Sequence, residues 1–330
     1  MNSRLILLIV PACALLPSGT ASQDGQVGDL CVELNRQVIG KATTGQLREA
    51  ETVLAEAMGS STNRLEPGCG GLLLHNLATI LYLSGRFAEA EVVAERSISA
   101  LQAALGPSAT GLLRPLHILA SARLEQGKIG KARQAITSMR PIPLESAEDR
   151  ILVHGAAAVL FHAEGRFTES ESEFSAALAE WERAGKPSGA EVASLYCGLA
   201  SLYLSTERLN DASRVLDRAL AALTAAPNAV PMDRIRLLQV RAALDRRKGN
   251  WRESQGDLEQ AIALARAEPR SDAGILISML ADYAQILRKR HQKRQARLVE
   301  QQATALQGHS APDNTVDVTE LLQRSKPNRK

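Results

Sequence analysis

Few residues in this chain of 330 could carry chemistry: it has six histidines and four cysteines. No GxSxG elbow, HExxH zinc motif or GxGxxG loop occurs, and no Gly-Lys pair has the earlier glycine that a phosphate-binding loop requires. No cysteines or histidines have the spacing of a zinc site. We therefore expect no catalysis and no cofactor, which leaves disulfide formation and polar recognition as the chemistry to examine.

A repeated helical unit must position these residues. An apolar run, a turn and a second apolar run recur seven times, with turns at positions 45, 85, 127, 165, 207, 249 and 291. Around Gly85 the apolar residues recur at helical spacing, and glycine suits the left-handed residue that ends a helix. Because such a hairpin cannot bury both apolar faces alone, neighbouring hairpins must stack. The pattern predicts an all-α fold, a right-handed α-solenoid of about seven hairpins over residues 28–306.

Two stretches predict breaks in this pattern. Residues 59–70 are polar and glycine-rich, which indicates a loop. Pro141 and Pro143 should end the second helix of their unit early, because proline lacks a hydrogen-bond donor and clashes with the preceding turn. Further units should end at Pro187, Pro227 and Pro269.

The unit resembles the tetratricopeptide repeat in its small, apolar and turn residues, which are Leu77, Ala78, Leu81, Gly85, Phe87, Ala90 and Ala94. The period near 42 residues resembles the kinesin-light-chain-like variety common in bacterial proteins. The chain departs from the pattern at Arg123 and Asp245, where a ring or an aliphatic side chain is expected. Glu207 and His291 replace the turn glycine, but we expect both turns to form because the flanking periodicity continues.

The resemblance implies a protein–protein interaction scaffold with a concave groove, lined by four positions in the first helix of each hairpin. These positions are polar and basic, with little acid, which suits an extended peptide with acidic groups. They are His75, Thr79, Tyr82, Arg114, His117, Ser121, His162, Ser194, Ser201, Arg236, Gln239, Arg246, Gln285 and Arg288.

Other interpretations stay open. The same residues would also fit ordinary solvated positions. The chain would also fit a structural component of envelope assembly that packs through its helix faces, or a regulatory module of a separate enzyme. The Lys/Asn arrangement by which chaperone-binding members of the family hold a C-terminal carboxylate is not reproduced, so that partner class is not indicated.

Cys31 and Cys69 lie close to one repeat apart, and equivalent positions of stacked repeats are neighbours in space. A disulfide is one interpretation for an exported chain, and two unlinked thiols are the other. Cys197, in the middle of a helix, is typical of a buried apolar residue. His75 and His117 are 42 residues apart and would allow a pH-sensitive contact, but two histidines without a third ligand do not indicate a metal site.

Residues 1–22 are typical of a secretory signal peptide. Arg4 precedes about a dozen apolar residues, small residues follow at 19–21, and the stretch is short for a membrane span of about 20 residues. Cys13 resembles the cysteine of a lipoprotein signal, although Pro11 fits that signal badly. We expect cleavage after Ala21 or Ser22, a periplasmic or secreted protein, and membrane contact only if Cys13 is lipidated.

The C-terminal part is polar and ends basic, so residues 307–330 are expected to be a disordered tail. The run from Arg288 to Arg297 is strongly basic. A polar face capping the last repeat explains it better than lipid or nucleic acid, since no aromatic residue interleaves it for base stacking. The net charge of +3 is also too small to indicate a polyanionic partner.

Overall fold

The computed structural model describes residues 29–43, 46–61, 67–83, 86–185, 189–225, 231–267 and 273–308. The expected signal peptide, the tail beyond residue 308 and the unit boundaries at Pro187, Pro227 and Pro269 lie outside these residues. Within them the structure contains fourteen α-helices, one short 3-10 helix and no strand, which confirms the all-α prediction.

The helices fall into two compact units. The first contains α1 (Asp29–Thr43), α2 (Leu47–Ser61), α3 (Pro67–Leu83), α4 (Phe87–Leu105), η2 (Thr110–Leu112), α5 (Leu113–Glu125) and α6 (Ile129–Thr137). The second contains α7 (Ala147–Ala163), α8 (Phe167–Arg183), α9 (Ala190–Ser205), α10 (Leu209–Thr224), α11 (Pro231–Lys248), α12 (Trp251–Ala267), α13 (Ala273–Lys289) and α14 (Lys293–Gly308).

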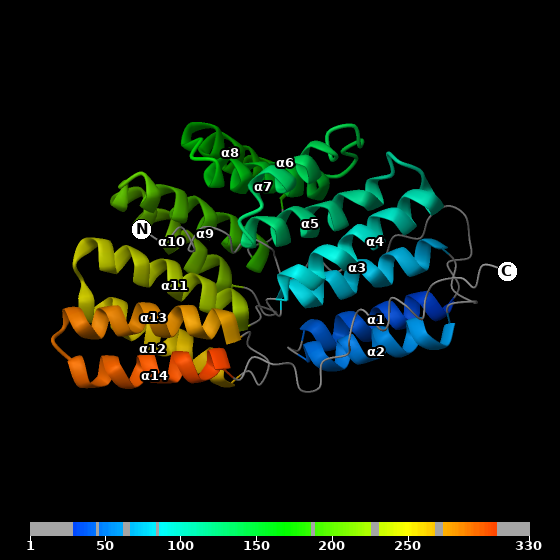
Figure 1. Ribbon diagram of the computed structural model, residues 1–330. Coiled ribbons are helices and arrows are strands. Elements are labelled where there is room, and N and C mark those ends of the chain that lie inside the picture. The colour runs from blue at the N-terminus through cyan, green and yellow to red at the C-terminus, as the bar shows by residue number, and fades with distance from the viewer. Residues whose placement is uncertain are drawn as a thin grey trace. The chain divides into compact units, whose positions relative to one another are not determined.

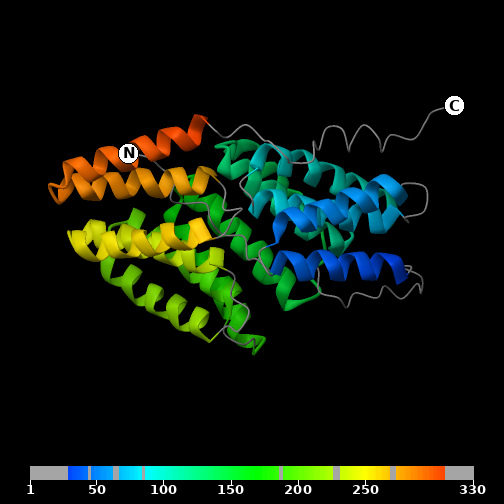
Figure 2. The ribbon, with the colours of Figure 1, turned by 90° about the horizontal axis from the view of Figure 1, so that it is seen from below.

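Consecutive helices pair as antiparallel hairpins, α1 with α2 through to α13 with α14 (Figure 1). The pairing is also visible from below, where α13 and α14 lie side by side (Figure 2). We call the first helix of each hairpin its A helix and the second its B helix. The seven hairpins are those predicted from the repeat.

One backbone hydrogen bond closes every hairpin. The N–H of the residue after the turn residue donates to the carbonyl five residues earlier, as in Lys128 to Arg123, at 2.8 or 2.9 Å in all seven turns. This is the bond of a Schellman motif, whose turn residue is left-handed. Gly165 has φ 74°, and Glu207 and His291 have φ 57° and 63°. The two turns without glycine therefore form as expected.

A small residue five positions after each turn lets the two helices approach closely. All seven are fully buried: Ala50, Ala90, Ala132, Ser170, Ala212, Ser254 and Ala296. The two serines also bond the A helix of their own hairpin. Ser170 Oγ donates to the Ala158 carbonyl at 2.8 Å, and Ser254 Oγ to the Ala242 carbonyl at 2.7 Å. Burial of a hydroxyl is tolerated there because it is hydrogen-bonded.

Ion pairs fix the register of neighbouring hairpins within each unit. The basic residue after a turn reaches an acidic residue six positions after the previous turn. Arg86 pairs with Glu51 at 2.7 Å, and Lys128 pairs with Glu91 at 2.6 Å. In the second unit, Arg208 pairs with Glu171 at 2.7 Å in the same way.

The structure corrects one predicted loop and confirms one short helix. Residues 59–61 belong to α2, and α3 begins at Pro67, so Cys69 lies in the first turn of α3 and not before it. Proline suits this first helical position because its missing N–H has no partner there. Helix α6 ends at Thr137, before Pro141, as predicted.

Candidate partner-binding surface

Most of the residues predicted to face a groove are buried between helices. None of His75, Thr79, Tyr82, His117, His162, Ser194, Ser201 and Arg236 exposes more than 7% of its surface. Neighbouring A helices, such as α3 and α5 or α9 and α11, contact each other directly. The side of these helices that the family pattern assigns to an open groove is therefore filled by the next A helix. These eight residues are not accessible to a partner, which corrects the prediction.

Several of these buried side chains have hydrogen-bond partners inside the fold. Thr79 Oγ1 donates to the His75 carbonyl at 3.0 Å, and Ser201 Oγ donates to the Cys197 carbonyl at 2.9 Å. Tyr82 Oη donates to a Glu125 carboxylate oxygen of the next A helix at 3.3 Å. The first two bonds lie within one helix and the third joins α3 to α5, so these buried polar groups are paired inside the fold and are tolerated there.

The histidines in the seams are held neutral. Burial lowers the pKa of His117 to about 4, and the nearby charges of His75 and Arg114 lower that pKa further. The predicted proximity of His75 and His117 is therefore found, but in a buried seam. Burial also lowers the pKa of His162 to about 4, and its Nε2 lies 2.9 Å from Ser205 Oγ. Both rings should resist protonation until the pH is well below the ordinary range of histidine.

Another seam, between α9 and α11, surrounds a free cysteine. Cys197 is buried and unbonded, as predicted. Burial raises the pKa of its thiol to about 12, and the charges of Arg236 and Asp233 act on that pKa in opposite directions. Because the thiolate is the reactive form, this cysteine should react slowly with electrophiles.

The remaining predicted residues are at least partly accessible. Arg114, Ser121 and Gln239 are half-buried. Two of the arginines already have acidic partners within the chain. Arg246 pairs with Asp282 of α13 at 2.8 Å, and Arg288 pairs with Glu300 of α14 at 2.7 Å. Acidic residues of the chain therefore already neutralise part of the basic charge that the sequence predicted for binding an acidic peptide.

Helix α13, the last A helix, has an open surface at the predicted positions. Ser278, Ala281, Gln285 and Arg288 occupy the positions that are all buried in α9 and, apart from half-buried Leu72, in α3, and all four are exposed. We call these four residues the α13 face. Two of them, Ser278 and Ala281, have small side chains.

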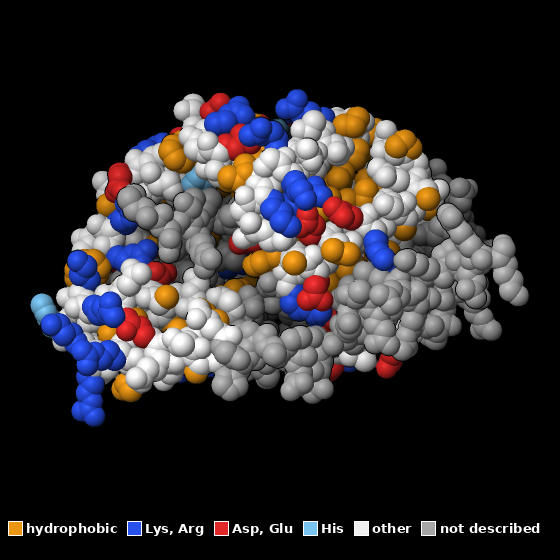
Figure 3. All heavy atoms as spheres, viewed as in Figure 1, with side chains coloured by type: hydrophobic (Ala, Val, Ile, Leu, Met, Phe, Trp, Pro, Cys, Tyr) orange, Lys and Arg blue, Asp and Glu red, His pale blue; other side chains and the backbone are white. Residues whose placement is uncertain are grey.

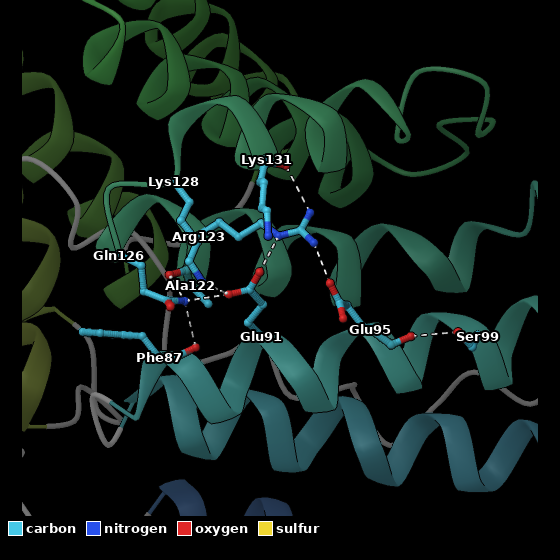
Figure 4. Close-up of polar contacts among 9 residues, drawn as sticks. All are labelled: Phe87, Glu91, Glu95, Ser99, Ala122, Arg123, Gln126, Lys128 and Lys131. Atoms are coloured by element: carbon cyan, nitrogen blue, oxygen red, sulfur yellow. Dashed lines mark hydrogen bonds and ion pairs between the residues drawn. The ribbon is translucent and has the colours of Figure 1, made fainter.

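A charged cluster around Glu91 was not found from the sequence. Glu91 of α4 is buried and accepts hydrogen bonds from Arg123 Nε at 3.0 Å, Gln126 Nε2 at 3.0 Å and Lys128 Nζ at 2.6 Å (Figure 4). Arg123 also reaches Glu95 at 2.6 Å. Burial opposes ionisation of Glu91, but the bonds from Lys128, Arg123 and Gln126 outweigh it and keep its pKa below the ordinary value. The signal for this cluster was Arg123 itself, at a position where the family has an apolar residue.

The two N-terminal cysteines are joined. A disulfide links Cys31 of α1 to Cys69 of α3, with their Cα atoms 6.0 Å apart. The bond ties the first A helix to the second, because Cys69 lies in the first turn of α3.

A metal ligand set and a membrane-spanning helix are both absent from the described residues. No group of three or more His, Cys, Asp or Glu side chains gathers there as a metal ligand set would. Among the helices of the described ranges, none has the length and apolar character needed to cross a membrane.

Comparisons with known proteins agree with this architecture. Residues 71–138 and 149–225 match the family described as Tetratricopeptide repeat. These two segments correspond to α3–α6 and α7–α10. No curated protein matches the chain.

Several solved structures share the fold at low sequence identity. A Rap protein complexed with Competence and Sporulation Factor is 14% identical, with a TM-score of 0.64, and the match covers 89% of this chain and 76% of that one. The Cut9–Hcn1 hetero-tetramer of APC/C is 11% identical, with a TM-score of 0.57 and coverages of 92% and 50%. BtubC (BKLC) from P. vanneervenii is 15% identical, with a TM-score of 0.51 and coverages of 72% and 96%. At these identities the likeness shows the fold alone.

Proposed function

We propose, from the premise that this chain is a tetratricopeptide repeat protein, that it is a non-catalytic scaffold which binds a segment of a partner protein. Two structures of similar fold support a binding role, since a Rap protein was solved with Competence and Sporulation Factor and Cut9 was solved with Hcn1. We place the binding site on the α13 face.

The open α13 face is the observation that carries this proposal. In α9 all four equivalent positions, and in α3 three of the four, are buried where the next A helix contacts the helix, whereas in α13 they are exposed. A helical segment of a partner can occupy the place that another A helix would take. Ser278 and Ala281 leave room for close packing, and Gln285 can donate and accept hydrogen bonds at the edge of the contact.

Arg288 favours an acidic residue at one end of that segment. Its side chain is 60% exposed, and it pairs with Glu300, which is itself 39% exposed. A surface ion pair of this kind contributes only about 0–1 kcal/mol, so a partner carboxylate can replace Glu300 at little cost. We therefore still expect an acidic residue in the partner segment, and we expect it to pair with Arg288 alone.

We also infer that the partner is met outside the cytoplasm. The signal-like N-terminus supports an exported protein, and the Cys31–Cys69 disulfide suits an oxidising compartment. Fractionation of the native cells, with alkylation of free thiols before lysis, tests this location. Recovery of the chain in the cytoplasm with Cys31 and Cys69 alkylated would contradict it.

The test of the binding site compares two matched alanine substitutions. Ala281→Arg places a long charged side chain on the α13 face, and Ala263→Arg makes the same change at an exposed position of α12. Proteins retained by the immobilised parent chain are identified, and their affinity for both variants is measured. We expect Ala281→Arg to weaken binding at least tenfold and Ala263→Arg to have little effect. Equal affinity for both variants would show that the partner binds elsewhere.

A further inference from the structure

The turn between α13 and α14 has an unusual concentration of positive charge. Residues 286–299 contain six lysines and arginines and no acidic residue. Figure 3 shows Lys and Arg side chains gathered at the edge of the molecule where α13 turns into α14. The six are Arg288, Lys289, Arg290, Lys293, Arg294 and Arg297, and we call them the basic turn.

The fold neutralises only part of this charge. Arg288 pairs with Glu300, Arg290 donates to Gln255, and Lys289 lies 6.0 Å from the ring centroid of Trp251. Lys293, Arg294 and Arg297 are exposed, and within the described part of the chain they have no acidic partner.

The position of these charges is unfavourable for helix α14. Lys293 and Arg294 begin α14, where the helix dipole is positive and favours acidic residues. Five other B helices follow that preference with Glu49, Glu89, Glu169, Asp211 and Glu253. A capping face needs polar residues but has no need of cations at this position. The cap that the sequence favours therefore does not explain the sign of the charge, and a local rule broken in this way points to function.

An exposed leucine lies next to the basic turn. Leu298 of α14 is 53% exposed, and it follows Arg294 by four residues, which places the two side chains on one face of the helix. Cations beside an exposed apolar side chain are typical of helices that lie on a lipid surface, where the apolar group enters between the headgroups.

We propose that the basic turn docks this protein onto an anionic lipid surface. A lipid surface fits better than an acidic peptide, because the cations lie on a protruding turn and not around a groove. Nucleic acid is disfavoured, since no Phe, Tyr or Trp lies between Arg288 and Arg297 to stack on a base. The docking needs no lipid attached at Cys13, and the basic turn shares only Arg288 with the α13 face.

The test is sedimentation of the full chain with vesicles of phosphatidylcholine alone or mixed with phosphatidylglycerol. We expect binding to the anionic vesicles, weakened by added salt as surface electrostatics requires. Lys293→Gln/Arg294→Gln should weaken that binding about thirtyfold, from about fivefold for each cation near an anionic surface. Leu298→Gln should weaken vesicle binding but leave binding to soluble polyglutamate unchanged.

The matched control is Arg218→Gln/Arg252→Gln, which removes the same charge from exposed positions on α10 and α12. It should bind anionic vesicles like the parent chain, and residues 1–22 are identical in every variant, so their affinity for lipid cancels. The melting temperature of Lys293→Gln/Arg294→Gln should stay the same or rise, which separates lost docking from lost folding. Equal binding by both double variants, or binding to polyglutamate or duplex DNA without binding to anionic vesicles, would overturn the proposal.

Discussion

The buried carboxylate of Glu91 accepts bonds from three side-chain donors, which come from α5 and the turn after that helix. Glu91→Gln removes the negative charge and leaves Arg123 and Lys128 with a weaker acceptor. We expect the free energy of unfolding to fall by about 1.5–3 kcal/mol, the range for a hydrogen bond to a charged group.

Glu95→Gln is the control for this change, because Glu95 also accepts from Arg123 but its side chain is 52% exposed. Urea unfolding should show a loss of only about 0–1 kcal/mol for it. Equal losses in the two variants would mean that burial of Glu91 does not increase its contribution to the free energy of unfolding.

The two neutral histidines predict a loss of stability in acid. His117 and His162 have pKa values of about 4 in the fold, below the ordinary value of 6.5, so the unfolded chain binds more protons between these values. Their contribution is complete above pH 6.5 and is lost as the pH falls toward 4, by about 3 kcal/mol for each ring. His117→Gln/His162→Gln should flatten unfolding free energy against pH in that window. An unchanged slope in that double variant would show that these two rings do not cause the loss.

At the residue scale, the helical periodicity of the sequence predicted the structure more accurately than the groove positions of the family pattern did. The turns at Glu207 and His291 were expected because helical periodicity on both sides specifies a turn whatever residue occupies it. The burial of His75 and Thr79 was missed, because the family pattern assumes an open groove. A signal was present in α3, whose residues 72–83 are apolar on nearly all sides, as in a fully buried helix.

The hairpins depend on the small residue five positions after each turn. Ala212 of α10 is fully buried against its own A helix, so Ala212→Leu inserts a side chain where no space exists. We expect a loss of about 1–3 kcal/mol in the free energy of unfolding. Ala221→Leu, at an exposed position of the same helix, should change it by no more than about 0.5 kcal/mol. Thermal unfolding of both variants checks this, and an equal effect would show that α9 and α10 have room to separate.

At the scale of elements, the seven hairpins could be predicted from spacing alone, because apolar periodicity and turn signals are local properties of the chain. Contacts between hairpins could not be predicted in the same way. The pairing of Arg246 with Asp282 joins residues 36 apart, and nothing in either neighbourhood indicates the other. Arg246 was predicted to be a free cation of the binding site for this reason. A basic residue looks available until its acidic partner in the next A helix is known.

For the molecule as a whole, the disulfide is expected to control the N-terminal hairpin. Cys31 and Cys69 close a loop spanning 38 positions, which stabilises the fold by about 3–4 kcal/mol in the chain-entropy model. Reduction should speed amide hydrogen exchange in α1 and α2, because their link to α3 is lost, and leave α11–α14 unchanged. The measurement is best made in a Cys197→Ala background, which removes the free thiol. Uniformly faster exchange would contradict a local role.

The hydrogen bond that closes every turn also bears on how the gene can change in length. A duplication or deletion that runs between equivalent points of two turns, usually 42 residues apart, joins an A-helix end to a turn of the same geometry. A cut inside a helix that is two residues longer or shorter would rotate the remainder of that helix by about 200° and bring its apolar side to the surface. Recombination can therefore add or remove whole hairpins while the apolar residues of the flanking helices stay on their buried side. The number of repeats is the feature of this chain that can change most freely.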